Sequence, residues 1–531
     1  MDTPRRRRTR YLQPQVVGAL VSIIVATLLA ACGGSGGGTV TSLPKDLRIL
    51  TTSGPPTFDQ WATVAQPLGI IMMVNEPLVR FDGAEFQPAV AESFETVTPT
   101  QYTYTLREGV TFSDGTALTG EDVKFSLEQG MDDSHYSTTH VVLSSIKDIA
   151  VSGNVVTVNL KAPEPQFQYV VAQTGIVSKA FYAKHGDAVG TPDVGQLGSG
   201  PYTLASFSPE EEMVVERNPD YWGEPAPFDS ITFAVTKDDS ARMLELQSGE
   251  ADGIFETPIN QVDPIDKLDG YTMHEVADTT LYILQMDATK APFNDPGVRD
   301  AIRHAIDRKA IVDAAFGGKG VVASTLTSAA ALESIADPTA VDDALAGFDK
   351  ANAYDAKVAK ADLAGSKSPK GFEVELPIET IDPNVTLISQ VVEQDLAKIG
   401  IKVKVKVRDA DYSAVLLEHD HQGLTLNSFS TNTPDPAMPL GYFTPADGVF
   451  NLTGLDNRSA VTALDKSNRL AVDDPARGDL ILEALTAQQE SGAILPLALP
   501  NMYFGLRDGL NPEGFTNYWW MARWDEGVSV Q

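Results

Sequence analysis

The sequence contains very little cysteine: Cys32 is the only one among 531 residues. A single thiol cannot form an intramolecular disulfide, so large hydrophobic cores must hold the fold together. C-x-x-C and H-E-x-x-H motifs are absent, and the G-x-S-x-G match at residues 33–37 lies in a glycine-rich stretch that no strand precedes. His419 and His421 flank Asp420 at a spacing that does not converge on one helix face, which favours a solvated turn over a cation site. We therefore expect no catalytic residues, no metal site and no cofactor.

Basic residues are also scarce, with 40 Lys and Arg against 72 Asp and Glu and a net charge of −32. Residues 1–31 carry five Arg and one Asp, so the rest of the chain carries −36. Such a surface repels nucleic acid, which we exclude as a partner. With 43% hydrophobic residues the chain is not disordered, and its length exceeds what one core normally holds. Two or more lobes are expected.

The longest N-terminal apolar run, residues 16–31, is shorter than the ~20 residues of a membrane span. Because it follows five arginines, it predicts a secretory signal peptide over residues 1–31, with an uncleaved span as the alternative. Ala30 and Ala31 before Cys32 resemble the cleavage site of a lipoprotein signal peptide, which implies a lipid on Cys32. We expect an exported protein anchored by that lipid to the outer face of the cytoplasmic membrane, with residues 32–45 as a flexible linker.

The residue patterns in the rest of the chain predict a mixed α/β fold. Alternating strands are predicted at residues 47–50, 102–106 and 155–160. Asp295 and Pro296 predict the start of one helix that continues to Gly317.

Later, residues 372–376 and 401–407 predict strands on either side of a helix. Leu387, Val391, Leu396 and Ile399 are assigned to one face of that helix, and the three segments form a βαβ unit. Residues 328–349 are polar, which predicts that this segment lies on the surface as an excursion from the main fold.

A series of short motifs follows in a fixed order along the chain. They are LRILTTSGPPTFD at 47–59, NEPL at 75–78, PAVAES at 88–93, YTLREGVTFSDG at 104–115, LTGEDVKFSL at 118–127, GSGPY at 198–202, RNPDYWG at 217–223, Pro292-Phe293, Val298-Arg299 and AIDR at 305–308. This series resembles the peptide/nickel class of ABC-transporter solute-binding proteins, in lipoprotein form, from about residue 47 to residue 497. The specific series identifies the scaffold but not the ligand.

The resemblance implies an α/β, two-lobed clamshell like the periplasmic binding proteins, with an extra subdomain inserted in the first lobe. The implied bounds are residues 46–75, 191–279 and 490–531 for lobe I, 76–190 for the inserted subdomain and 280–489 for lobe II. The implied protein is not an enzyme but a monomer that captures peptides or peptide-like solutes and delivers them to membrane permease subunits. An oligosaccharide, an amino-acid conjugate or a chelated metal remains an alternative ligand, and an extracytoplasmic hydrolase is a weaker alternative function.

The same resemblance implies which residues face the ligand. They are Ser53, Gly54, Thr57, Phe58, Trp61, Tyr282, Gln285, Ser428, Phe429, Ser430 and Asn432. In peptide-binding relatives an aspartate at the position of Asn432 pairs with the α-amino group of the peptide. An amide accepts a hydrogen bond from an ammonium group but supplies no countercharge, and Asp435 is the alternative partner. Trp61 is predicted either to stack on the ligand or to fill a core.

Overall fold

The structure is a computed structural model that describes residues 42–62, 68–132, 139–472, 474–513 and 515–530. The predicted signal peptide, Cys32 and most of the predicted linker lie outside these residues. Within the described part of the chain, no helix combines the length and the hydropathy that crossing a membrane requires.

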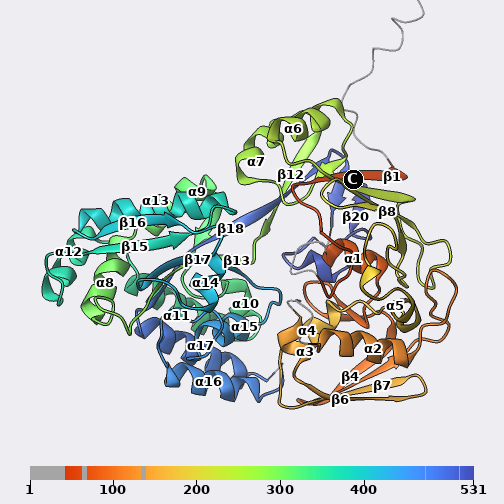
Figure 1. The fold of residues 1–531 in the computed structure, drawn as a ribbon, viewed down its shortest axis with the longest axis horizontal. Coiled ribbons are helices and arrows are strands. Elements are labelled where there is room, and N and C mark those ends of the chain that lie inside the picture. Colours follow the sequence, from red (N-terminus) through yellow and green to blue (C-terminus); the bar gives the residue numbers. More distant parts are fainter. Residues whose placement is uncertain (1–41, 63–67, 133–138, 473, 514, 531) are drawn as a thin grey trace, which may run out of the picture.

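In Figure 1 the molecule has two masses, by which we mean the part on the left that contains α8 to α17 and the part on the right that contains β1 to β8. A sheet of ten strands joins them. Its strands are β1 (Asp46–Thr51), β8 (Tyr202–Ser208), β9 (Glu212–Arg217), β10 (Ser230–Val235), β11 (Gly253–Ile254), β12 (Tyr271–Ala277), β13 (Thr280–Met286), β14 (Gly320–Val322), β17 (Leu424–Ser430) and β18 (Ile494–Arg507). The order is β17-β13-β18-β11-β1-β10-β9-β8, with β12 and β14 also paired to β18. The first part of β18 pairs with β13 and β14, and its last part pairs with β11 and β12. One strand therefore belongs to both masses.

Residues between β1 and β8 build a second, four-stranded sheet, β4-β5-β7-β6, with helices on one side (Figure 1). This part contains α1 (Leu68–Val74), β2 (Val79–Phe81), β3 (Phe86–Pro88), β4 (Ala91–Thr98), β5 (Gln101–Leu106), α2 (Gly120–Gly130), α3 (His140–Leu143), β6 (Ile146–Ser152), β7 (Val155–Leu160), α4 (Phe167–Ala172), α5 (Lys179–His185) and η1 (Gly186–Ala188). The predicted strands at 102–106 and 155–160 are confirmed as β5 and β7. Gly198 approaches the backbone closely, because a Cβ there would lie 1.9 Å from the Val74 carbonyl oxygen.

The remaining elements flank the long sheet. They are α6 (Asp239–Ser248), α7 (Ile259–Asp266), α8 (Pro296–Ala305), α9 (Arg308–Phe316), α10 (Ala329–Glu333), α11 (Pro338–Ala351), α12 (Ala356–Gly365), β15 (Glu373–Ile378), α13 (Pro383–Lys398), β16 (Lys402–Val407), α14 (Tyr412–Leu417), α15 (Ala437–Phe443), α16 (Arg458–Asn468), α17 (Ala476–Glu490), β19 (Leu510–Pro512), η2 (Trp519–Met521) and β20 (Val528–Val530). The predicted βαβ unit is confirmed, because β15 and β16 pair in parallel on either side of α13 in the sequence.

Two details of the α-helical predictions are wrong. The single helix predicted from Asp295 to Gly317 is two helices, α8 and α9, because Asp307 accepts a hydrogen bond from Ala310 N–H (3.0 Å) and caps a new helix. The predicted apolar face of this helix is confirmed at Leu396 and Ile399, which are buried in a core, but is wrong at Leu387, which is 38% exposed while Val385, Ile388 and Val392 are buried.

The segment predicted as a surface excursion, residues 328–349, forms α10 and most of α11. Leu332, Val341 and Phe348 anchor these helices in a core. The sequence pattern did not predict these helices, because the many Ala and Asp residues around these three side chains made the segment look polar.

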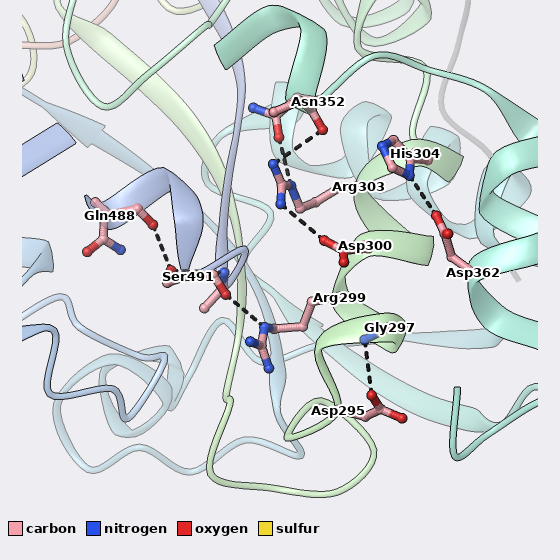
Figure 2. Close-up of polar contacts among 12 residues, drawn as sticks. Asp295, Gly297, Arg299, Asp300, Arg303, His304, Asn352, Asp362, Gln488 and Ser491 are labelled. Carbon is pink, nitrogen blue, oxygen red and sulfur yellow. Dashed lines mark hydrogen bonds and ion pairs between the residues drawn. The ribbon is translucent and has the colours of Figure 1, made fainter. Parts of the chain in front are cut away.

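Polar residues of α8 tie this helix to neighbouring parts of the chain (Figure 2). Arg299 Nε donates a hydrogen bond to the Ser491 carbonyl oxygen (3.0 Å), and Arg303 Nε donates one to Asn352 Oδ1 (2.8 Å). The motif that contains Arg299 therefore fixes α8 against the chain after α17.

Candidate functional site

The segment after β1 carries five predicted ligand contacts, and the structure separates them by burial. Phe58 and Trp61 are 0% and 1% exposed and belong to hydrophobic cores. Thr57 Oγ1 donates a hydrogen bond to the Gly190 carbonyl oxygen (3.2 Å). Ser53 is exposed and Gly54 is half-buried. Ser53 is thus the most accessible member of this group, and Gly54 and Thr57 are both half-buried.

Tyr282 and Gln285 both lie on β13, but they point to opposite faces of the sheet because successive strand side chains alternate. The Tyr282 hydroxyl donates to Asp382 Oδ2 (2.5 Å). Gln285 is fully buried on the other face, where its Nε2 donates to Asn427 Oδ1 (3.1 Å).

Strand β17 pairs with β13 in antiparallel register and brings the next three predicted residues to the same region. Ser428 lies opposite Tyr282, and Ser430 lies opposite Thr280. The hydroxyls of Ser430 and Thr280 are 2.9 Å apart. Phe429 points to the opposite face and packs in a core.

The loop after β17 contacts parts of the chain that are distant in sequence. The Asn432 carbonyl oxygen accepts a hydrogen bond from Gln173 Nε2 (2.7 Å), and the Tyr518 hydroxyl donates to the Thr433 carbonyl oxygen (2.9 Å). Asp435 is 4% exposed, and both of its carboxylate oxygens accept from Arg477 Nη2 (2.7 and 2.6 Å). Asp435 is therefore committed to a buried ion pair, whereas the Asn432 side chain is half-buried.

A cavity of about 220 Å³ lies where the chain crosses between the two masses of Figure 1. Its lining residues are Glu256, Thr257, Pro258, Ile259, Asp278, Thr280, Tyr282, Phe316, Asn384, Pro500, Asn501 and Met502. Some of these residues follow β11 or lie on β13 and β18, the strands that meet at the crossing. Others lie at the start of α7, at the end of α9 and at the start of α13. Tyr282 is the one predicted ligand contact among them.

The cavity is acidic. Asp278 Oδ1 accepts from the N–H groups of Thr279 (2.6 Å) and Thr280 (3.0 Å), an arrangement that turns the chain into β13. Burial raises the pKa of Asp278, and those hydrogen bonds oppose the rise. Burial, and secondarily the charge of Asp278, raises the pKa of Glu256 to about 7. Among the residues that line the cavity in the described chain, none is Lys or Arg.

Sequence reasoning missed Glu256, Asp278 and Asn384. The Asp-Thr-Thr sequence at 278–280 is a recognisable turn signal, but nothing local distinguishes it from other such turns. Glu256 adopts a left-handed backbone conformation (φ 50°), which is uncommon for a residue other than glycine and is invisible in the sequence.

The described residues contain no group of three or more His, Cys, Asp and Glu side chains arranged to hold a metal ion. His421 Nδ1 accepts a hydrogen bond from Gly423 N–H (3.1 Å), and burial lowers the pKa of this imidazole to about 4. The His419 and His421 pair thus forms part of a turn, with one ring nitrogen used locally.

Known proteins resemble this chain in sequence and in fold. The family model described as Bacterial extracellular solute-binding proteins, family 5 Middle, matches residues 85–451. The glutathione-binding protein GsiB of Escherichia coli (strain K12) is 29% identical over 407 residues, which cover 75% of each chain.

Solved structures also superpose on the chain. The PBP AgaA from A. tumefaciens R10, in complex with agropinic acid, is 25% identical, with a TM-score of 0.73 over 92% of this chain and 99% of its own. The oligopeptide-binding protein AppA from Bacillus subtilis, in complex with a nonapeptide, is 18% identical, with a TM-score of 0.72 over 92% and 99%. The predicted mixed α/β fold of the periplasmic binding proteins is therefore confirmed.

Proposed function

Because the chain belongs to the family 5 bacterial extracellular solute-binding proteins, we propose that it captures a peptide-like solute for an ABC importer. Membership of this family makes the chain a binding protein and not an enzyme. The named relatives bind glutathione, a nonapeptide and agropinic acid, all of which contain amino-acid units or derive from them. A peptide or an amino-acid conjugate is thus the favoured ligand class.

The proposal includes two lobes that close over the ligand. Lobe I is residues 46–75, 191–279 and 490–531, the inserted subdomain is 76–190, and lobe II is 280–489. Two cores draw their residues from 281–498, one mainly from 61–176, and two from the remaining segments, which supports this division except that residues 494–498 pack in the cores of lobe II. Ligand that contacts both lobes would stabilise the closed state by its differential affinity.

The observation that carries the proposal is the cavity walled by both sides of the crossing. Glu256 and Thr257 belong to the lobe I segments, whereas Tyr282, Phe316 and Asn384 belong to lobe II. A solute held between such walls loses its water and links the two lobes. The contacts of Gln173 and Tyr518 with the loop after β17 are small and polar, as a reversible closure requires.

The partners follow from the same role. The closed protein would dock on permease subunits in the membrane, and a lipid on Cys32 would hold it at the outer face of that membrane. We propose that it acts as a monomer, since one chain supplies both walls of the cavity.

Native mass spectrometry of the purified protein tests the ligand class. We expect a retained solute whose mass and fragments identify a peptide or an amino-acid conjugate. Small-angle scattering with that solute should then show a smaller radius of gyration at unchanged secondary structure. A retained oligosaccharide, or identical dimensions with and without a tightly bound solute, would contradict the proposal.

A further inference from the structure

The loop between β17 and α15, residues 431–436, accepts two hydrogen bonds from the other mass of the molecule. Gln173 Nε2, at the end of α4, donates to the Asn432 carbonyl oxygen (2.7 Å). The Tyr518 hydroxyl donates to the Thr433 carbonyl oxygen (2.9 Å), and its ring packs in the same core as α4. In Figure 1, α4 lies in the right-hand mass and α15 in the left-hand mass. Two side chains that are distant in sequence thus hold consecutive carbonyl groups of one loop.

The rest of lobe II fixes the position of this loop. Asp435 accepts from Arg477 of α17 (2.7 and 2.6 Å) and from the Ala437 N–H group that begins α15 (2.8 Å). Pro434 and Pro436 flank Asp435 and restrict the backbone, because the proline ring fixes φ. We therefore expect the carbonyl groups of the loop to keep their positions when the two masses move apart, so that they can accept again without a rearrangement.

The contact between the two masses at this loop is small. Within the described chain, none of the helices α2 to α5 packs extensively against α15, α16 or α17. Gln173 is 1% exposed, and its Oε1 is buried without a hydrogen-bond partner in that part of the chain, so it acts through its N–H group alone. A hydrogen bond between neutral groups adds little net stability, because both groups bond to water when they are apart. Two such bonds bias an equilibrium between open and closed protein without locking it.

The contact also needs no solute. Both acceptors are main-chain oxygens and both donors are side chains, so every atom of the contact belongs to the protein itself. Neither Gln173 nor Tyr518 lines the cavity of about 220 Å³ at the crossing. The contact is therefore separate from the cavity in which we place the solute, and it can form while that cavity contains only water.

We propose that Gln173 and Tyr518 form a latch on residues 431–436, which holds the two lobes closed for part of the time even when no solute is bound. The inference rests on the two-lobe closure proposed above and assigns part of the closing free energy to the protein itself. The affinity for a solute increases with the fraction of protein that is already in the binding-competent state. The latch therefore raises the affinity for every solute by the same factor and leaves the preference among solutes unchanged.

Distances between the lobes in solute-free protein test the inference. Cys32→Ala removes the only native thiol, so Lys147→Cys on β6 and Lys466→Cys on α16 place one spin label on each side. Both lysines are exposed. The protein is freed of retained solute by unfolding and refolding, which native mass spectrometry checks, and double electron–electron resonance then gives the distance distribution. We expect a short-distance population beside a longer one.

Three variants assign the short-distance population to the latch. Tyr518→Phe removes one donor and retains the ring, and Gln173→Ala removes the other donor. Gln173→Glu keeps the shape but places a carboxylate oxygen against the Asn432 carbonyl oxygen. Each should reduce the ratio of closed to open protein by about two- to tenfold, the range expected for one neutral hydrogen bond. Gln87→Ala and Tyr354→Phe change exposed residues of the same types and should leave the ratio unchanged.

Glutathione and Ala-Ala-Ala separate the latch from the proposed function. Solute-free protein with long distances only, or a short-distance population that none of the three variants reduces, would overturn the latch, and a probe that still increases this population would leave the proposed function intact. Variants that reduce the population while neither probe binds would support the latch and count against peptide capture. Where both probes bind, Gln173→Ala should weaken both by one common factor, and a change in their ratio would overturn the inference. One fixed distance in every sample would overturn both.

Discussion

Individual carboxylates in this molecule have roles that depend on whether the fold gives them a partner. Asp435 and Arg477 form an ion pair whose side chains are 1% and 0% exposed. Arg523 and Asp525 form a second buried pair, at 2.6 Å. Glu256 has no such partner within the described chain. The Asp435–Arg477 pair joins the loop after β17 to α17, whereas Arg523 and Asp525 are neighbours in one turn, where Asp525 also accepts a hydrogen bond from the Tyr202 hydroxyl.

Asp435→Asn should lower the free energy of unfolding by about 3–5 kcal/mol, because it leaves the Arg477 guanidinium buried without a countercharge. Urea denaturation followed by circular dichroism measures the change. Asp456→Asn is the matched control, since it breaks the exposed pair with Arg458 and should cost less than about 1 kcal/mol. Equal effects of the two substitutions would contradict this assignment.

At the scale of the elements, short capping contacts decide where helices begin and end. Residues 295–317 have helical periodicity throughout, but Ile306 adopts an extended conformation (ψ 117°) and Asp307 caps the next helix. The break lets α8 pack against α12 while α9 packs against α13. The same segment could not serve both neighbours as one straight helix.

Asp307→Ala should therefore destabilise the protein by about 1 kcal/mol through loss of the α9 cap. Asp307→Asn should be nearly neutral, because asparagine caps helices as well as aspartate does. Thermal denaturation of both variants separates the cap from the charge. If the asparagine variant lost as much stability as the alanine variant, the charge of Asp307 and not its cap would be responsible.

For the whole molecule, the important contacts join segments that are far apart in the sequence. Strand β18 pairs with strands of both masses, and Gln173 reaches the loop after β17. Glu164 lies near Asp435 and Arg477, and burial raises its pKa to about 7. The proposed contact between subdomain and lobe II thus contains a titratable group.

We expect the proposed closure to depend on pH. If opening returns the Glu164 pKa towards its ordinary value of 4.5, the closed state binds more protons between pH 4.5 and 7, so closure weakens as pH rises through that window. The equilibrium should change by up to about tenfold per pH unit. Small-angle scattering from pH 5 to 8 should show this dependence for the wild type and not for Glu164→Gln. A Glu108→Gln control, at an exposed site, should retain it.

The proposed anchor is tested on the whole chain. Cys32→Ala should move the protein from the membrane fraction to the soluble fraction, or leave it unprocessed, because an acyl chain contributes about 0.8 kcal/mol per buried CH₂. Fractionation with an antibody against the protein measures the distribution. Wild-type protein found in membranes without a lipid on residue 32 would contradict the anchor.

The sequence by itself determined the elements whose signals are local. Alternation predicted β1, β5 and β7, and the βαβ unit followed from strand and helix periods read over about 35 residues. The ordered motifs indicated the family and the mixed α/β fold, because their turn and helix-capping residues occur in an order that resembles one scaffold.

Only the tertiary structure decided which polar groups meet at the crossing. Glu256 and Asp278 are 22 residues apart in the sequence, and Asn384 lies more than 100 residues further on, yet all three line one cavity. Their juxtaposition depends on long-range strand pairing through β18, which no local pattern encodes. Whether a carboxylate is paired likewise depends on distant residues. Arg477 forms an ion pair with Asp435, whereas no residue of the described chain hydrogen-bonds to the Glu256 carboxylate.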